Sequence, residues 1–173
     1  MGRQVTLETM VRIRRRLRRA GKKVVFTNGT FDILHRGHVE YLAAARSLGD
    51  VLVVGLNSDA SIRRIKGPSR PINRGADRSA VLRALRSVDY VCMFGADTPR
   101  RLIERLLPDV LVKGADWSVN AVVGKEIVEK HGGCVRLVRL TAGRSTTAVI
   151  RRVLGNYGVR PPREKVQRGN RRK

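Results

Sequence analysis

The stretch KVVFTNGTFDILHRGHVEYLAAARSLGDVLVVGLN, residues 23–57, decides the fold because it contains one complete strand–helix–strand unit. Residues 23–29 form an unbroken apolar run, which is typical of a strand buried on both faces of a parallel sheet. Residues 37–49 predict a helix, and residues 51–57 predict a second buried strand. A helix between two such strands indicates the α/β class.

The same alternation continues along the chain. We expect further strands at 90–94, 109–114 and 134–140, and further helices at 76–88, 98–107, 122–132 and 145–155. The polar segment between these units, residues 58–75, is rich in Pro and Gly and predicts a long functional loop with at most a short helical piece. Five strands alternating with helices predict a doubly wound, parallel five-stranded sheet of the Rossmann-like kind.

Both ends of the chain are basic. Residues 1–21 contain a predicted amphipathic helix whose apolar residues, three or four apart from Met10 to Ala20, form one stripe, with arginines on the other face. Residues 156–173 have no periodicity and predict a disordered tail. We therefore expect one folded domain over residues 1–155, followed by this tail.

The net charge of +23 is concentrated at the ends, since residues 1–23 and 151–173 each hold nine bases and one acid. Such runs either bind anionic polymers through counterion release or are simply solvated. We favour solvated ends because the arginine runs lack the interleaved aromatic side chains on which single-stranded nucleic acid stacks. Nucleic acid is therefore not the expected main partner.

The location is predicted from cysteines and hydropathy. Cys92 and Cys134 lie in separate apolar stretches and are expected to be free thiols, which suits a reducing cytoplasm. The sequence has no window of about 18 apolar residues and no apolar segment typical of a secretory signal behind the first arginines. We predict a cytoplasmic protein without a membrane partner.

The segment between the first strand and its helix has the residues of a phosphate site. Asn28 and Gly29 allow a tight turn, and Gly37 removes a side chain where the helix begins, so that a ligand can approach the backbone. A helix N-terminus presents free N–H groups and a partial positive charge, which suit phosphate. His35 and His38 flank this end and can both donate to phosphate oxygens.

The sequence lacks the additional residues that other kinds of site at the two histidines would need. A zinc site needs three or four ligands, but the remaining histidine, His131, lies late in a predicted helix, so we assign no metal ligands. The chain also lacks a nucleophile elbow, a Walker-type phosphate loop and a dinucleotide-binding glycine pattern after a strand.

Three further segments fit the same anionic ligand. In TAGRSTT, residues 141–147, a glycine and three hydroxyl residues open a helix, where a single cap would suffice. Lys113 and Asp116 lie at the end of the strand predicted at 109–114 and could meet a phosphate and a ribose, or form a charged turn. Lys66 lies in a basic loop that could close over an anion or remain solvated.

Together these segments resemble the HxGH cytidylyltransferase-like nucleotidyltransferases, most closely the branch that adenylylates heptose 1-phosphate. The likeness covers residues 22–154. It is carried by TNGTFDILHRGH (27–38), NSD (57–59), IKGPSRPIN (65–73), LVKGADW (111–117) and GRSTT (143–147).

The resemblance implies roles for individual residues. His35 and His38 would bind the nucleotide phosphates and stabilise the transition state, and Lys66 would meet the phosphates of both substrates. The remaining implied nucleotide-binding residues are Thr30, Phe31, Arg86, Lys113, Asp116, Gly143, Ser145, Thr146 and Thr147.

The implied reaction transfers AMP from ATP, with Mg²⁺, to D-glycero-β-D-manno-heptose 1-phosphate, giving ADP-heptose and pyrophosphate. The resemblance also implies a homodimer. Ala115 departs from the Gly or Asp of many relatives, which bears on base selectivity. The sugar-kinase domain often fused upstream is absent from this sequence, so we expect a separate kinase chain.

Two other functions remain open. One is a sister activity, glycerol-3-phosphate cytidylyltransferase or a related alcohol-phosphate enzyme, because it shares the histidine and hydroxyl motifs. The other is a nucleic-acid-binding protein on a degenerate transferase scaffold, which the charge of +23 motivates.

Overall fold

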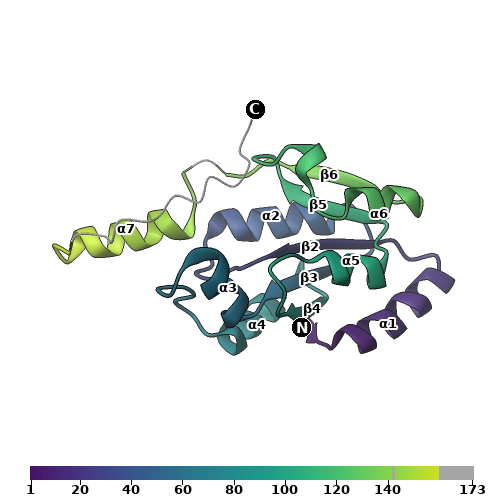
Figure 1. Ribbon diagram of the computed structural model, residues 1–173, viewed down its shortest axis with the longest axis horizontal. Helices are drawn as coiled ribbons and strands as arrows, with labels where there is room; N and C mark the ends of the chain where they lie inside the picture. The colour runs from purple at the N-terminus through teal and green to yellow at the C-terminus, as the bar shows by residue number, and fades with distance from the viewer. Residues whose placement is uncertain (142, 160–173) are drawn as a thin grey trace.

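The structure is a computed structural model that describes residues 1–141 and 143–159. These residues form one sheet of six strands in the order β1-β4-β3-β2-β5-β6, and every neighbouring pair is parallel (Figure 1). The strands are β1 (Arg3–Gln4), β2 (Val24–Gly29), β3 (Val51–Asn57), β4 (Tyr90–Phe94), β5 (Val110–Gly114) and β6 (Cys134–Val138). The predicted α/β class and parallel sheet are confirmed, with one strand more than expected.

Strand β1 is the additional one. It pairs with β4 through Arg3 opposite Tyr90 and Gln4 opposite Val91. Two polar residues carry no apolar pattern, so the sequence did not predict this strand.

The helices are α1 (Leu7–Arg19), α2 (Arg36–Arg46), α3 (Asp59–Lys66), α4 (Gly75–Ala84), α5 (Arg100–Leu106), α6 (Lys125–Lys130) and α7 (Thr146–Asn156), with a short 3₁₀ helix at Val119–Ala121. Helix α3 corrects the expectation that residues 58–75 are mainly a loop. Ser58 caps it by accepting a hydrogen bond from Ser61 N at 3.2 Å, which satisfies a free backbone donor.

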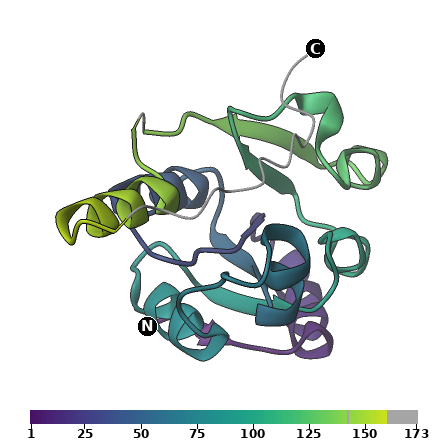
Figure 2. The same cartoon turned by 60° about the vertical axis from the view of Figure 1, so that its left-hand side comes forward.

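The central strand β2 has two buried faces. Val24 and Phe26 lie in a core with α1, α5 and α6, whereas Val25 lies in a second core with α2 and α4. The two groups of helices lie on opposite faces of the sheet (Figure 2). All three side chains are fully buried, as alternation along a strand between two helical layers requires. This is the doubly wound arrangement that the sequence predicts.

The order of the strands defines a switch point. From β2 the chain adds β3 and β4 on one side, and then returns to add β5 and β6 on the other side. Ligands of doubly wound sheets bind beyond the carboxyl ends of the strands at this reversal, here between β2 and β5.

The C-terminal helix α7 projects from the body of the fold (Figure 1) and ends at Asn156, one residue beyond the predicted domain boundary. Most of the predicted disordered tail, residues 160–173, lies outside the described residues. Within the described ranges, no helix has the length and hydropathy needed to cross a bilayer.

Helix α1 is attached through one arginine of its predicted solvent face. Arg14 is buried, and its Nε donates to the carbonyls of Leu106 and Leu107 at 3.3 and 3.2 Å. Its Nη2 lies 2.8 Å from Asp109 Oδ1, and Asp109 Oδ2 accepts a hydrogen bond from Val24 N at 2.7 Å. One carboxylate therefore joins α1 to the first core strand, which corrects the expectation that all arginines of this helix face water.

Replacement Asp109→Ala should lower the free energy of unfolding by about 2–3 kcal/mol, because Arg14 would remain buried without its counter-charge and Val24 N would lose its acceptor. Urea denaturation measures this loss. The matched control is Asp97→Ala, which breaks the exposed pair with Arg64 and should cost less than about 1 kcal/mol. Equal losses in the two variants would contradict the role of Asp109.

Candidate active site

The loop after β2 places three rings together. Phe31 has a positive φ of 42°, and His35 is the extended residue that precedes α2. The rings of His35 and His38 are stacked with their centroids 3.8 Å apart, and Phe31 meets His38 edge-on at 5.2 Å. The two predicted phosphate donors therefore form one unit at the N-terminus of α2.

Gly37 is required at this helix start. A Cβ on Gly37 would lie 3.1 Å from Cβ of Arg144 and 3.2 Å from Cε1 of His35, both of which are tight contacts. The space freed by the glycine is thus used by the segment around Arg144 and by the histidine ring. The glycine thus permits the close approach of two loops, and the approach of a ligand to this backbone stays a prediction.

The second predicted anion site, residues 141–147, lies beside the first. Thr146 Oγ1 is 3.5 Å from the carbonyl of Ile33, and Thr141 Oγ1 donates to Glu40 of α2. Ser145 caps α7 by accepting a hydrogen bond from Ala148 N at 3.1 Å. The N-termini of α2 and α7 therefore meet on one rim of the molecule.

Gly143 and Thr147 complete this segment. Gly143 has a φ of +68°, a conformation that favours glycine, and Thr147 lies in the first turn of α7. The structure therefore groups the four residues predicted in GRSTT at one helix start.

The pair predicted after β5 lies at the switch point. Lys113 Nζ donates to Asn28 Oδ1 at 2.5 Å and so connects the carboxyl ends of β5 and β2. Burial lowers the pKa of Lys113 to about 8, and the nearby Asp116 carboxylate acts in the opposite direction. A Cβ on Gly114 would lie 2.6 Å from Asp116 Oδ1, so the glycine lets Asp116 fold back over the strand end.

Lys66, the last residue of α3, reaches the same loop from the β3 side. Its Nζ donates to Thr30 Oγ1 at 3.4 Å. Thr30, Phe31 and Lys66 thus lie together with the histidines, as the sequence predicts.

The environment keeps both histidines neutral near pH 7. Burial lowers the pKa of His38 to about 4, helped by the charges of His35 and Lys66 and weakly opposed by the Ile33 backbone. Burial also lowers the pKa of His35, and Arg144 adds to this effect. In the described part of the chain, the Nδ1 atoms of both rings are buried without a hydrogen bond. This favours the tautomer with its proton on Nε2, ready to donate to a ligand.

Arg86 is not part of this group. It follows α4 and precedes β4, at the amino-terminal edge of the sheet, where it lines a shallow pocket with Val39 and Arg46. Helix α4 carries the chain from the carboxyl edge back to the amino edge, which places Arg86 away from the histidines. Its predicted role in holding the nucleotide is therefore not supported within one copy of the chain.

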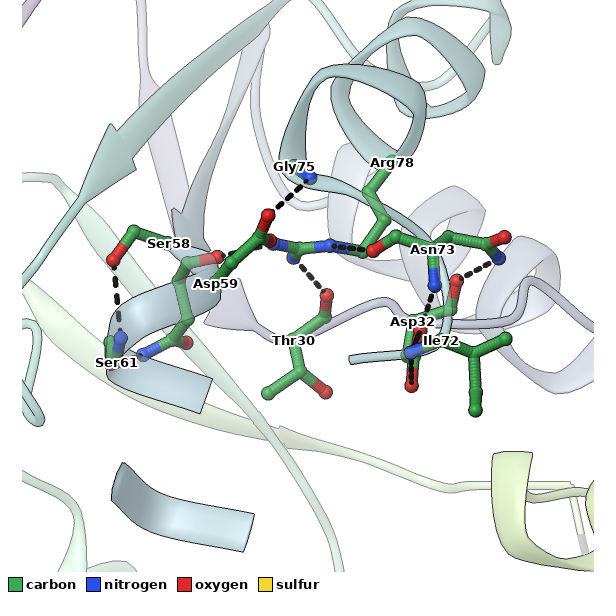
Figure 3. A network of polar contacts seen from close by, with 10 residues as sticks. Thr30, Asp32, Ser58, Asp59, Ser61, Ile72, Asn73, Gly75 and Arg78 are labelled. Carbon is green, nitrogen blue, oxygen red and sulfur yellow. Dashed lines mark hydrogen bonds and ion pairs between the residues drawn. The ribbon is translucent and has the colours of Figure 1, made fainter. Parts of the chain in front are cut away.

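Arg78, which no sequence pattern marks, lies at the centre of the hydrogen bonds that support the site. Arg78 is buried, and its guanidinium donates to the carbonyls of Thr30 at 2.6 Å, Asn57 at 2.8 Å and Asn73 at 3.1 Å (Figure 3). Its Nη2 also pairs with Asp59 Oδ1 at 2.7 Å. Arg78 therefore connects the ends of β2 and β3 to the segment before α4.

Asp32 holds the neighbouring loop in a similar way. Its carboxylate accepts from Ile72 N at 2.8 Å, Asn73 N at 2.9 Å and Arg70 Nη1 at 3.1 Å. Asn73 Nδ2 donates back to the Asp32 carbonyl at 2.7 Å (Figure 3). These bonds fix the loop that follows Lys66 against the loop that carries Phe31. An arginine among many and a lone aspartate gave no sequence signal for these roles.

Comparison with known proteins gives one consistent group. A protein-family model described as cytidylyltransferase-like matches residues 26–153. The "Bifunctional protein HldE" of Syntrophotalea carbinolica is 59% identical over 140 residues, which are 81% of this chain and 29% of that protein. The protein of the same name from Mesorhizobium japonicum is 62% identical over 130 residues, 75% of this chain and 26% of that protein.

Two solved structures are similar to this chain. The lipopolysaccharide core biosynthesis protein from Thermoplasma volcanium has a TM-score of 0.58 and 30% identity, over 70% of this chain and 98% of that chain. A pantoate-beta-alanine ligase from Francisella tularensis, complexed with a nucleotide, has a TM-score of 0.59 at 15% identity, over 85% of this chain and 69% of that chain. The second likeness shows the shared fold alone.

These findings confirm the predicted family and the prediction of a nucleotidyltransferase. The chain spans 29% of the length of the relative from Syntrophotalea carbinolica, which is named as bifunctional. The expectation that a kinase acts as a separate upstream chain is therefore not supported.

Replacement Arg78→Lys should loosen the loop of the histidines, because one ammonium cannot reach the four acceptors of the guanidinium fork. We expect faster native-state hydrogen exchange at the amides of residues 30–38, and a loss of about 3 kcal/mol in the free energy of unfolding. Arg74→Lys, at an exposed position beside the same helix, is the control. Unchanged exchange at residues 30–38 would refute the supporting role.

Proposed function

The chain belongs to the cytidylyltransferase-like family, and from that premise we propose that it transfers AMP from ATP to D-glycero-β-D-manno-heptose 1-phosphate, with release of pyrophosphate. The observation that carries the proposal is the meeting of two anion-binding helix starts, one with His35 and His38 and one with Ser145 and Thr146. In this proposal both helix starts bind one polyphosphate chain, which is what nucleotidyl transfer requires.

The choice of the heptose branch is supported by sequence. KGPSRPIN and LVKGADW resemble that branch, and the relatives named HldE are 54–62% identical over their matched regions. The similar protein from Thermoplasma volcanium is described as a lipopolysaccharide core biosynthesis protein, and that role is compatible with an ADP-heptose product destined for a surface glycan.

The chemistry needs no general base. The nucleophile is an oxygen of the sugar 1-phosphate, which is already ionised near neutral pH because its second pKa is about 6. This oxygen attacks the α-phosphorus of ATP in line, a new P–O bond forms, and the bond to the β-phosphate oxygen breaks as pyrophosphate leaves. The enzyme must align the two phosphates and offset their negative charge.

The residues of the site divide this work. The neutral rings of His35 and His38 donate from Nε2 to phosphate oxygens at the reacting end, and the N-terminus of α2 adds its partial charge. Ser145, Thr146 and Thr147 at the start of α7 hold the β- and γ-phosphates. Lys66, beside Thr30, lies on the β3 side and bridges the acceptor phosphate to the nucleotide.

The cation belongs to the substrate in this proposal. Among the described residues, no group of three or more His, Cys, Asp or Glu could hold a metal ion. Mg²⁺ commonly binds through substrate phosphates and few protein ligands, so we propose that it arrives bound to ATP. A homodimer and a cytoplasmic location remain predictions.

A panel of ATP and CTP against heptose 1-phosphate and glycerol 3-phosphate tests the substrate assignment, with pyrophosphate release as the readout. We expect the ATP and heptose 1-phosphate pair to have the highest kcat/KM, and chelation of Mg²⁺ to abolish turnover. A preference for CTP with glycerol 3-phosphate would instead establish the sister activity. Tight, salt-dependent nucleic-acid binding without turnover of any pair would favour the degenerate-scaffold alternative.

Replacement His38→Ala should lower kcat by about 10²–10³, the usual effect of removing one donor to the developing charge. His131→Ala is the control, because His131 is exposed beyond α6 and contacts the Ile127 carbonyl instead of the site. Initial rates of pyrophosphate release measure both variants. Normal turnover by a folded His38→Ala protein would show that the histidine has another role.

A further inference from the structure

The only tryptophan of the chain, Trp117, is an exposed aromatic side chain without an assigned role. Its side chain is 45% exposed, and it lies three residues beyond the end of β5. Leu140, at the same edge after β6, is 42% exposed and packs over Gly114. Two large apolar side chains thus face water beside a rim that is otherwise polar and cationic.

The position of Trp117 relative to the strand ends is defined by Lys113. Lys113 Nζ lies 5.6 Å from the centroid of the indole ring, and the same ammonium donates to Asn28 at the end of β2. The hydrogen bond from Trp117 N to the Gly114 carbonyl, at 3.1 Å, holds the turn that carries the ring. The indole therefore lies near the carboxyl ends of β2 and β5, where the strand order reverses.

The histidine loop has one side next to β3 and another next to β5, where Trp117 lies. The residues on the two sides indicate which part of the ligand lies beside Trp117. Lys66 reaches the loop from α3, on the β3 side, and is the candidate contact for the acceptor phosphate. In the proposed function, the polyphosphate binds at the starts of α2 and α7, between these two sides. The side next to β5 is then left for the nucleoside end of the triphosphate.

We propose that Trp117 is the stacking platform for the nucleobase of the bound nucleoside triphosphate. This inference rests on the proposed nucleotidyl transfer. An indole offers a flat apolar face, and every base has a π-face, so stacking contributes affinity without choosing between bases. Trp117 is thus an affinity residue for ATP and CTP alike, and the choice of base depends on polar groups such as Asp116.

The single tryptophan is also the probe for this proposal. Excitation at the red edge of the indole band avoids the three tyrosines, so the emission reports Trp117 alone. Titration with ATP in the presence of Mg²⁺ should quench this emission in a saturable way, whereas inorganic tripolyphosphate, which lacks a base, should bind and leave the emission nearly unchanged. Equal effects of ATP and tripolyphosphate, or quenching by heptose 1-phosphate alone, would overturn the proposal.

Two variants give an independent readout. Trp117→Ala should raise KM for ATP by about 5- to 100-fold, the equivalent of one lost stacking contact, with a smaller change in KM for the sugar phosphate. Trp117→Phe should recover much of the affinity. Tyr157→Ala, which removes an aromatic side chain that is 81% exposed beyond α7, is the control and should leave both constants unchanged.

The outcomes separate the two proposals. If the wild-type protein releases pyrophosphate but Trp117→Ala has an unchanged KM for ATP, the stacking role is wrong and the transferase function stands. If calorimetry shows that the wild-type protein binds neither ATP nor CTP, both proposals fail.

Discussion

The site depends on one buried cation, the guanidinium of Arg78. A charge without contact with water is costly, and this one is stabilised by three backbone carbonyls and the carboxylate of Asp59. Each carbonyl belongs to a different segment, so the fork geometry fixes the ends of β2 and β3 relative to the start of α4 (Figure 3). The carbonyl of Thr30 accepts a hydrogen bond from Arg78, and its side-chain hydroxyl accepts one from Lys66. Thr30 therefore connects the supporting arginine to a candidate ligand-binding residue.

Around this support the site brings together hydrogen-bond donors and positive charge, namely the rings of His35 and His38, Lys66 and the start of α7. Burial lowers the pKa of both His35 and His38, so their rings are uncharged near pH 7 and do not repel Lys66 and Arg144. These rings therefore contribute hydrogen-bond donors in the proposed mechanism, while the positive charge near them is carried by Lys66 and Arg144.

The sequence predicted two kinds of feature: strands and helices with a regular apolar pattern, and short segments in which unusual residues occur close together. Apolar runs of five to seven residues located β2, β3 and β4 at nearly their observed bounds, and the paired histidines beside Gly37 marked the start of α2 as the candidate site. The support could not be predicted, because Arg78, Asp32 and Asp59 gain their roles only when separate loops fold together. The role of Arg86 was predicted from a resemblance alone. The direction of α4 instead places Arg86 at the amino-terminal edge of the sheet, away from the histidines.

The short strand β1 affects how the molecule behaves in solution. A long strand at the border of a parallel sheet offers unpaired backbone groups that template aggregation with another chain. Here the border strand β1 has only two residues, which pair with Tyr90 and Val91 of β4, and at the opposite border the exposed Arg136 lies in the middle of β6. Together with the net charge of +23, these borders favour a sheet that resists growth by strand addition at high protein concentration.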